Sequence, residues 1–157
     1  MSHVEIAYPE TTNFSCQLTV RISDINYGNH LGHDGMITMI HEARILFFRS
    51  LGYSELDIEG VGTLIADLAI TYKNEAFYGD MLEFDISVQK LGSKSCQLYY
   101  RINRVCDKQE TRKLIALAKT GVVFFDFTQR KSVAIPVPFI ESIERQVSKT
   151  LDGRCAL

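Results

Sequence analysis

The sequence predicts an α+β fold: a curved antiparallel sheet of five or more strands wrapped around one long helix. The first observation behind this fold class is a single long segment with apolar residues at helical spacing on nearly all sides. The second is a set of segments in which apolar and polar residues alternate, as in half-buried strands. The third is the shortness of the links between the later strands, which favours antiparallel pairing because parallel strands need long crossovers. A sheet of this kind buries an apolar helix by curling around it.

The first strand and the long helix come early in the chain. The strand is expected at Cys16 to Asp24, with alternate residues on an inner apolar face. The residues of that face are Leu18, Val20 and Ile22. The helix is expected from about His33 to Leu51, and its broad apolar stripe predicts that most of the helix is buried.

Further strands are expected after the helix, within a single domain of 157 residues. They cover Thr63–Lys73, Met81–Lys90, Lys94–Val105 and Thr111–Phe127. The second of these alternates most clearly, with Leu82, Phe84, Ile86 and Val88 inward and Glu83, Asp85, Ser87 and Gln89 outward. We expect the polar residues 1–15 to lie loose on the surface and an amphipathic helix to cover 137–148.

Composition argues against several classes of function. Of the residues, 46% are apolar and the formal net charge is −2, which argues against a nucleic-acid partner that needs a broad basic face. No run of eighteen apolar residues occurs, so no membrane span is expected. The start has no secretory signal pattern, and the cysteines have no C-x-x-C spacing. We therefore expect no metal site, a cytoplasmic location and reduced thiols at Cys16, Cys96, Cys106 and Cys155.

The residues able to do chemistry gather in the loop between the first strand and the helix. They are Asp24, Asn26, Tyr27, Asn29, His30, His33 and Asp34. The helix that follows contributes its start, where backbone N–H groups have no intrahelical partner and carry partial positive charge. Such groups suit an anion, or a carbonyl oxygen that becomes negative during a reaction.

Three short motifs occur in order along this framework. The stretch from Asp24 to His33 reads DINYGNHLGH, the helix carries Glu42-Ala43-Arg44, and a later strand opens with Tyr78-Gly79-Asp80. Together with the element order, they resemble the hotdog-fold acyl-CoA thioesterases of the 4-hydroxybenzoyl-CoA thioesterase-like family, whose first strand commonly ends in D-x-D-x-x-G-H-V-N-N. The resemblance covers roughly Leu18 to Phe127. It implies hydrolysis of an acyl thioester, with coenzyme A only as part of the substrate and no further cofactor.

The family's second aspartate in D-x-D is commonly the catalytic carboxylate, and Asn26 stands at that position in this chain. An amide is neither a nucleophile nor a general base. Asn26 therefore either orients a water or contacts the thioester, or it is a turn residue that tolerates an unusual backbone angle. By the same resemblance, the backbone N–H of His33 would hold the oxyanion, and the alternative is a helix end that the polar loop simply caps.

Three ionisable residues are further catalytic candidates. Asp24 is a displaced base or, alternatively, a brace that accepts hydrogen bonds from backbone N–H groups. Glu42 on the helix is a general base that faces a partner's loop, as in a related thioesterase branch, or it pairs with Arg44 or Arg49, or it lies at the edge of the helix. A buried glutamate there would suit a base near neutrality. His30 matches the family's histidine; we expect it to shape the loop, and it is also an acid–base candidate.

The main hypothesis is a thioesterase in which water attacks the carbonyl of an acyl-CoA or acyl-carrier-protein thioester. One alternative is a hydratase or dehydratase that uses Asp24 and His30 as acid and base. Another is a non-catalytic acyl-thioester-binding dimer. Open sheet edges invite pairing, which predicts a homodimer or a dimer of dimers. The acyl group stays open.

Overall fold

The computed structural model describes residues 3–106 and 111–152. The elements follow the predicted order, with the long helix ahead of four long strands. They are β1 (Phe14–Thr19), η1 (Ile22–Asp24), α1 (His33–Ser50), β2 (Gly62–Tyr72), β3 (Met81–Gln89), β4 (Ser95–Cys106), β5 (Thr111–Asp126), β6 (Lys131–Ser132) and α2 (Val137–Asp152). The three cysteines in this part of the chain are free, and Cys155 lies outside the described residues.

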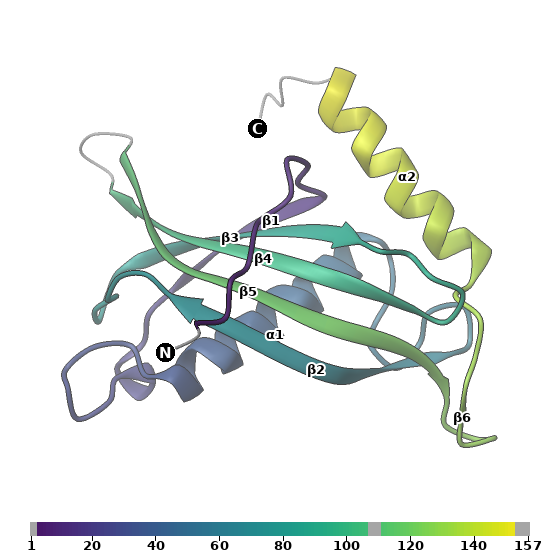
Figure 1. Ribbon diagram of the computed structural model, residues 1–157, viewed down its shortest axis with the longest axis horizontal. Coiled ribbons are helices and arrows are strands. Elements are labelled where there is room, and N and C mark those ends of the chain that lie inside the picture. Colours follow the sequence, from purple (N-terminus) through teal and green to yellow (C-terminus); the bar gives the residue numbers. More distant parts are fainter. Residues whose placement is uncertain (1–2, 107–110, 153–157) are drawn as a thin grey trace.

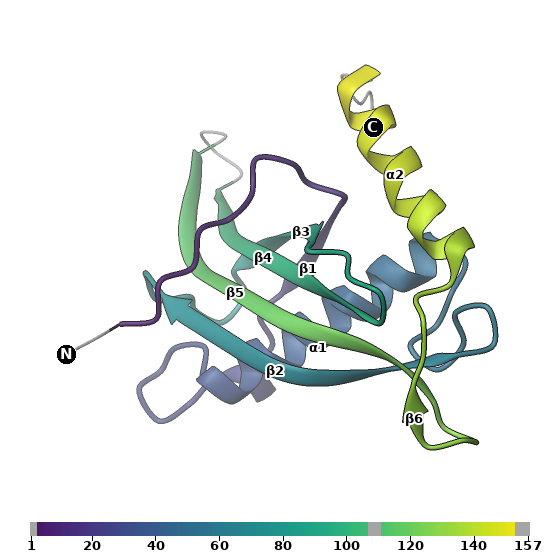
Figure 2. The same ribbon diagram turned by 45° about the vertical axis from the view of Figure 1, so that its right-hand side comes forward.

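The strands form one antiparallel sheet in the order β1-β3-β4-β5-β2, with β6 paired to β5. Figure 1 shows α1 running along one face of this sheet, and the sheet curving around it. Figure 2 shows from a second direction that the N-terminal segment crosses the opposite face. The predicted fold class, a curved antiparallel sheet around one long helix, is therefore confirmed.

The core lies between the inner face of the sheet and one face of α1. Met36, Met39, Ile40, Ala43 and Phe47 recur at helical spacing, and each is at most 2% exposed. Alternate residues of β3, β4 and β5 pack with them in one cluster, namely Leu82, Phe84, Ile86, Leu98, Tyr100, Ile102, Ala116 and Ala118. Burying one large apolar side chain stabilises a fold by about 1.5–3 kcal/mol, so these contacts hold α1 firmly along its length.

The other face of α1 is not buried, which corrects the expectation that most of the helix is enclosed. His33, Asp34, Thr38, His41 and Glu42 are all exposed on this face. These polar residues interrupt the apolar stripe, so the helix is amphipathic within the single chain.

The first strand begins and ends earlier than predicted. It pairs with β3 from Phe14 to Thr19, and the chain then turns through η1. Ile22, expected on the inner face, is 69% exposed. The cause is local, because the carboxylate of Asp24 accepts a hydrogen bond from the backbone N–H of Arg21 at 2.8 Å and thereby closes a turn.

The expectation that the N-terminal segment lies loose is wrong. The segment crosses the outer face of the sheet (Figures 1 and 2). The hydroxyl of Thr71 in β2 donates a hydrogen bond to the carbonyl of Val4. Further along, the side-chain oxygen of Asn13 accepts a hydrogen bond from the N–H of Val88 in β3 at 2.8 Å. The segment is therefore tied to β2 at one edge of the sheet and to β3 near the other edge.

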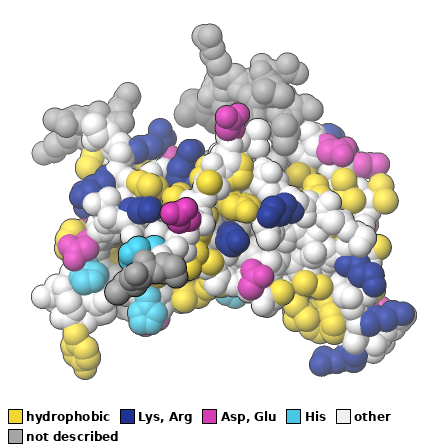
Figure 3. All heavy atoms as spheres, viewed as in Figure 1, with side chains coloured by type: hydrophobic (Ala, Val, Ile, Leu, Met, Phe, Trp, Pro, Cys, Tyr) yellow, Lys and Arg dark blue, Asp and Glu magenta, His cyan; other side chains and the backbone are white. Residues whose placement is uncertain are grey.

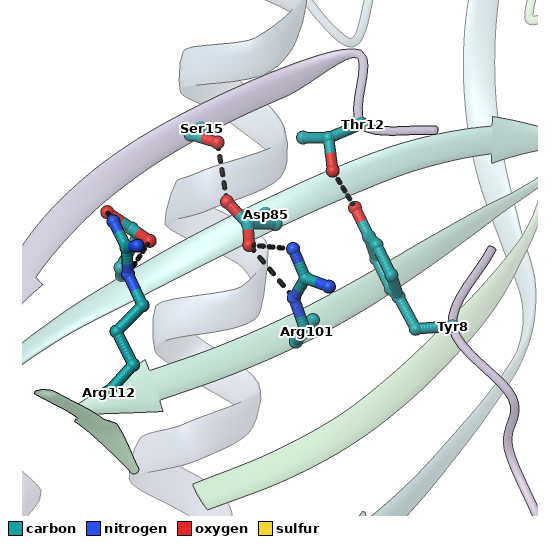
Figure 4. Close-up of polar contacts among 7 residues, drawn as sticks. Tyr8, Thr12, Ser15, Asp85, Arg101 and Arg112 are labelled. Carbon is teal, nitrogen blue, oxygen red and sulfur yellow. Dashed lines mark hydrogen bonds and ion pairs between the residues drawn. The ribbon is translucent and has the colours of Figure 1, made fainter. Parts of the chain in front are cut away.

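A cluster of polar side chains lies beneath this segment (Figure 4). Asp85 accepts a hydrogen bond from Ser15 and forms an ion pair with Arg101 at 2.8 Å. The guanidinium of Arg101 lies 4.5 Å from the ring centre of Tyr8, whose hydroxyl contacts Thr12. Asp85 points outward as predicted, but it is only 6% exposed because these partners cover it.

The remaining boundaries agree with the prediction to within one residue, except that α2 extends to Asp152. The first turns of α2 are anchored by Phe139, whose ring centre lies 5.2 Å from that of Phe124 and 6.2 Å from that of Phe48. None of the described helices has the length and apolar surface that a membrane crossing requires. Figure 3 shows basic and acidic side chains interspersed over the face that it views.

Candidate active site

The N-terminus of α1 is open. Gly32 precedes the helix in an extended conformation, with φ −72° and ψ 159°, and no side chain among the described residues caps this end. The first helical hydrogen bond runs from the N–H of Met36 to the carbonyl of Gly32 at 2.9 Å. The N–H groups ahead of Met36, including that of His33, therefore lie at the positive end of the helix without intrahelical acceptors. This end suits an oxygen that carries or develops negative charge.

A cavity of about 390 Å³ opens at this helix end. The loop before α1, the first turn of α1, the end of β2 with the link that follows it, and β5 all contribute to its wall. Its polar lining residues are Asn26, His30, His33, Lys73, Asn74 and Glu75. Its other lining residues are Leu31, Met36, Tyr72, Ala76 and Ile115. The cavity thus joins an apolar wall to a polar rim, and it brings together three of the predicted site residues.

Tyr72, at the end of β2, lines the same cavity as His33 at the start of α1. Burial, together with the negative charge of Asp34, raises the pKa of Tyr72. The phenol is therefore protonated near neutrality and supplies a hydrogen-bond donor at the edge of the cavity.

Asp24 is buried, and its side chain does not line the cavity. Its carboxylate accepts a hydrogen bond from the backbone N–H of Arg21 and pairs with the side chain of that residue at 3.2 Å. Its backbone carbonyl accepts a hydrogen bond from the N–H of Gly32 at 3.0 Å. Of the two roles predicted for Asp24, this geometry is that of the brace, because the residue holds the turn that leads into α1.

Asn26 is held by the turn and still faces the cavity. Its side-chain oxygen accepts a hydrogen bond from the N–H of Gly28 at 2.9 Å. Its amide nitrogen lies on the other side, 3.7 Å from the position that a Cβ of Gly32 would take. The oxygen thus stabilises the turn, while the nitrogen is a donor beside the helix start, and a contact of this amide with water or the thioester stays a prediction. The unusual backbone angle belongs to Asn29, with φ 63°.

His30 lies against the link that follows β2. Its Nδ1 is 3.1 Å from the carbonyl oxygen of Gly28 and 3.7 Å from the carboxylate of Glu75. The next residue, Leu31, donates its N–H to the carbonyl of Ala76 at 2.8 Å, which fixes the loop against this link. The histidine ring is thus placed by contacts on both sides, at the rim of the cavity.

Glu42 is exposed and lies outside the cavity. The alternative of an ion pair with Arg44 is wrong, because Arg44 lies on the buried side of α1 and binds Glu55 at 2.6 Å. No ion pair with Arg49 is found within residues 3–106 and 111–152 either. That Glu42 faces the loop of a partner stays a prediction.

Sequence reasoning missed the contribution of the link after β2, above all Glu75. The signal was a polar run, Lys73-Asn74-Glu75, at the end of a predicted strand. What the sequence lacked was the strand order, which puts β2 at the edge of the sheet and its end next to the loop before α1. Polar residues that follow a strand are normally read as a solvated turn.

The groups around the cavity suit chemistry at a carbonyl. Backbone N–H groups and the amide of Asn26 are donors for a carbonyl oxygen, and an imidazole next to a carboxylate suits proton transfer. No group of three or more His, Cys, Asp or Glu side chains in the described part of the chain is arranged to hold a metal ion.

A curved sheet around one helix, with an open helix end at a partly apolar cavity, is the arrangement of a hotdog-fold thioester hydrolase. The chain belongs to the thioesterase-like superfamily, whose match extends over residues 20–146. No curated protein matches the sequence.

Several solved structures share this fold. The 1,4-dihydroxy-2-naphthoyl-CoA thioesterase from Synechocystis is 20% identical, with a TM-score of 0.72, and the match covers 83% of this chain and 94% of that one. The DHNA-CoA thioesterase from Staphylococcus aureus is 19% identical, with a TM-score of 0.73 and coverage of 90% and 95%. A mutant of 4-hydroxybenzoyl CoA thioesterase with asparagine in place of an aspartate, complexed with 4-hydroxybenzoyl CoA, is 18% identical, with a TM-score of 0.74 and coverage of 83% and 97%. These similarities confirm the hotdog fold predicted from the sequence.

Proposed function

We propose that this protein hydrolyses an acyl-CoA thioester to a carboxylic acid and coenzyme A. The observation that carries the proposal is the uncapped N-terminus of α1 at a cavity with an apolar wall and a polar rim. Membership of the thioesterase-like superfamily supports it independently. Water is the second reactant, and no resident cofactor is needed.

In the proposed reaction the thioester carbonyl oxygen lies against the N–H of His33. A water molecule attacks the carbonyl carbon, and the negative charge that develops on the oxygen is stabilised by the helix end and by the amide nitrogen of Asn26. The carbon–sulfur bond then breaks, and the thiol leaves with a proton. The apolar wall, which includes Leu31, Met36 and Ile115, faces the acyl group.

Coenzyme A is the proposed thiol carrier. The similar solved structures are described as thioesterases of 1,4-dihydroxy-2-naphthoyl-CoA and 4-hydroxybenzoyl CoA, which makes aromatic acyl-CoAs the first substrates to test. Lys73 at the polar rim offers a positive charge to a phosphate of the carrier. An acyl carrier protein is the comparison that the experiment should include.

We propose that two copies of the chain pair through β2. This strand is an edge of the sheet, and it exposes Leu64, Ile65, Leu68 and Tyr72 by 37–47% each. An exposed edge with apolar side chains is a template for pairing. Because Tyr72 also lines the cavity, the partner would lie beside the site. A measurement of the molecular mass in solution tests this pairing, and it also tells whether two such dimers associate further.

A cytoplasmic location is part of the proposal, and the thiols support it. Cys16, Cys96 and Cys106 are unpaired, as is usual in a reducing compartment. Burial raises the pKa of Cys16 to about 11 and that of Cys96 to about 12, so both thiols are protonated and unreactive at neutral pH.

The decisive experiment measures thiol release from aromatic, short, medium and long acyl-CoAs and from one acyl carrier protein thioester. We expect hydrolysis of at least one acyl-CoA. A protein that binds acyl-CoA without releasing thiol would instead be the non-catalytic binder. The hydratase alternative has less support, because its proposed acid, Asp24, is held by Arg21 outside the cavity.

The role of the helix end is tested by removing one N–H group. His33 is the first residue of α1 and Gly32 before it is extended, so proline fits at position 33 without breaking the helix. We expect His33→Pro to lower kcat by about 10²- to 10³-fold, as the loss of one oxyanion donor does. His33→Ala keeps the N–H and is the matched control. Equal rates for the two variants would contradict the proposed role.

A further inference from the structure

The reaction needs a base, and the residue that the family usually provides is absent. Asn26 has no carboxylate, and its side-chain oxygen is already bound to the N–H of Gly28. Asp24 is paired with Arg21, and Glu42 is exposed outside the cavity. Within one chain, the base must therefore be sought among the other residues that line the cavity.

Among the described lining residues, Glu75 is the only carboxylate, and His30 and His33 are the only imidazoles. Glu75 and His30 come from opposite sides, one from the link after β2 and the other from the loop before α1. The distance from Nδ1 of His30 to Oε1 of Glu75 is 3.7 Å. His33, the other imidazole of the lining, forms no ion pair within residues 3–106 and 111–152. Lys73 and His33 are the remaining ionisable groups on the wall besides Tyr72.

The surroundings of His30 decide which ring nitrogen carries the proton. Nδ1 faces two acceptors, the carbonyl oxygen of Gly28 at 3.1 Å and the carboxylate of Glu75. A nitrogen between two acceptors is the protonated one in the neutral ring, because only an N–H donates to them. Nε2 then keeps its lone pair and is able to accept a proton. The side chain of His30 is 33% exposed, so water reaches the ring.

We propose that His30 is the general base of the thioesterase reaction and that Glu75 is its positioning residue. This inference rests on the function proposed above and assigns its missing proton acceptor. The carbonyl of Gly28 holds the Nδ1–H tautomer, and the carboxylate of Glu75 stabilises the imidazolium that forms when Nε2 takes up a proton. The pair thus replaces the carboxylate that the family has at the position of Asn26.

The proposed step balances in protons and electrons. One proton of the attacking water moves to Nε2 of His30 while the water oxygen bonds to the carbonyl carbon, and the carbonyl electron pair moves onto the oxygen at the helix end. As the carbonyl reforms, the carbon–sulfur bond breaks and its electron pair leaves with sulfur. Nε2 returns the proton to that sulfur, which restores the neutral ring. The products are the carboxylic acid and the thiol.

The test compares four proteins on one acyl-CoA that the wild type hydrolyses. His30→Gln should lower kcat by about 10²- to 10⁴-fold, the usual contribution of general acid–base catalysis. Glu75→Gln should lower it only by about two- to fivefold, because Glu75 is partly in solvent and exposed pairs couple weakly. Glu141→Gln, at an exposed glutamate on α2 outside the cavity, is the matched control and should equal the wild type.

Three further readouts separate a positioning role from a merely structural one. In Glu75→Gln the loss should fall on kcat while KM stays within about twofold of the wild type, because Glu75 lies against the imidazole and acts on the proton transfer. Added imidazole should restore part of the activity of His30→Ala. Nitrogen-15 NMR of the wild type should find the proton of neutral His30 on Nδ1.

Several outcomes would overturn the inference. They are wild-type activity in His30→Gln, a Glu75→Gln variant that matches Glu141→Gln in both kcat and KM, and a neutral His30 protonated on Nε2. A wild type that is inert toward every acyl-CoA overturns the proposed function and the inference together. An active wild type with an equally active His30→Gln variant overturns the inference alone, so the two failures are distinguishable.

Discussion

In the loop before α1, the partner of one atom decides what a residue contributes. Asn26 binds the turn through its oxygen, which leaves only a donor for the cavity. His30 faces two acceptors through Nδ1, which leaves only an acceptor. The carboxylate of Asp24 is paired with Arg21. Residue type alone lists what each side chain is able to do, and these contacts select one option for each.

A carboxylate introduced at position 26 should substitute for the proposed base. In the wild type the side-chain oxygen of Asn26 accepts a hydrogen bond from the N–H of Gly28 at 2.9 Å. In Asn26→Asp one carboxylate oxygen keeps this hydrogen bond, and the other replaces the amide nitrogen near the helix start. We expect the double variant of Asn26→Asp and His30→Gln to recover at least about tenfold in kcat/KM over His30→Gln, because a positioned base contributes about 10²–10⁴. Thiol-release kinetics of the two single variants and the double variant measure it. No recovery in a folded double variant would contradict the expectation.

At the scale of elements, α1 is held against η1 by a close approach at Gly35. A Cβ at this position would lie 2.9 Å from the backbone oxygen of Asp24, a contact that side chains do not make. The absence of a side chain therefore sets how near the helix end comes to the turn, and hence where the open N–H groups lie.

Gly35→Ala should destabilise the protein although alanine favours helices. The clash costs about 1–3 kcal/mol, as overpacking does, which exceeds the gain in helix propensity of at most about 1 kcal/mol. Urea unfolding should show a lower free energy of unfolding. Thr38→Ala, on the exposed face of the same helix, is the control and should change that energy by no more than about 0.5 kcal/mol. A Gly35→Ala variant as stable as the control would contradict the close approach.

A second tie joins α1 to the link that leads into β2. Glu55 binds the guanidinium of Arg44 at 2.6 Å and the ring of His41 at 2.9 Å. Burial alone would raise the pKa of Glu55, but the hydrogen bonds from these two residues outweigh it and lower that pKa below its ordinary value of 4.5. The folded state therefore prefers the ionised carboxylate.

This preference gives stability a defined pH dependence. A carboxylate with a lowered pKa stabilises the fold above its ordinary pKa, and that stabilisation is lost as the pH falls through the folded-state value. Glu55→Gln should thus lower the free energy of unfolding by about 1–3 kcal/mol at pH 7, since the pair is only partly buried. The difference from the wild type should shrink below pH 4.5. A difference that stays constant from pH 7 to pH 3 would contradict this account.

At the scale of the whole molecule, the fold was predictable because periodicity reports which face of an element is buried. The alternation in β3 and the spacing of Met36, Met39 and Ala43 indicate the inner faces without any knowledge of contacts. The site was only partly predictable. Its loop lies in one stretch of sequence, but Glu75 reaches it through the strand order, which periodicity does not report. The turn at Arg21 was missed for a similar reason, because a side-chain hydrogen bond overrides the alternation there.

The edge at β2 gives a prediction for the assembly. The wild type should sediment as a multiple of its 17.8 kDa chain mass. Ile65→Lys places a charge in the middle of the proposed interface and should shift the protein to the monomer, as lysines on natural edge strands prevent pairing. Val137→Lys, at an apolar residue that is 63% exposed away from β2, is the control and should leave the mass unchanged. A monomeric wild type would contradict pairing through β2.

The crossing of the outer face by residues 3–13 has a consequence for variation among relatives. Tyr8, Ser15, Asp85 and Arg101 come from three separate stretches of sequence and form one continuous set of contacts. A neutral replacement of Asp85 would leave the guanidinium of Arg101 beneath the tyrosine ring without its carboxylate partner. These positions should therefore covary. In relatives that begin later, we expect the pair on β3 and β4 to be replaced together by uncharged side chains.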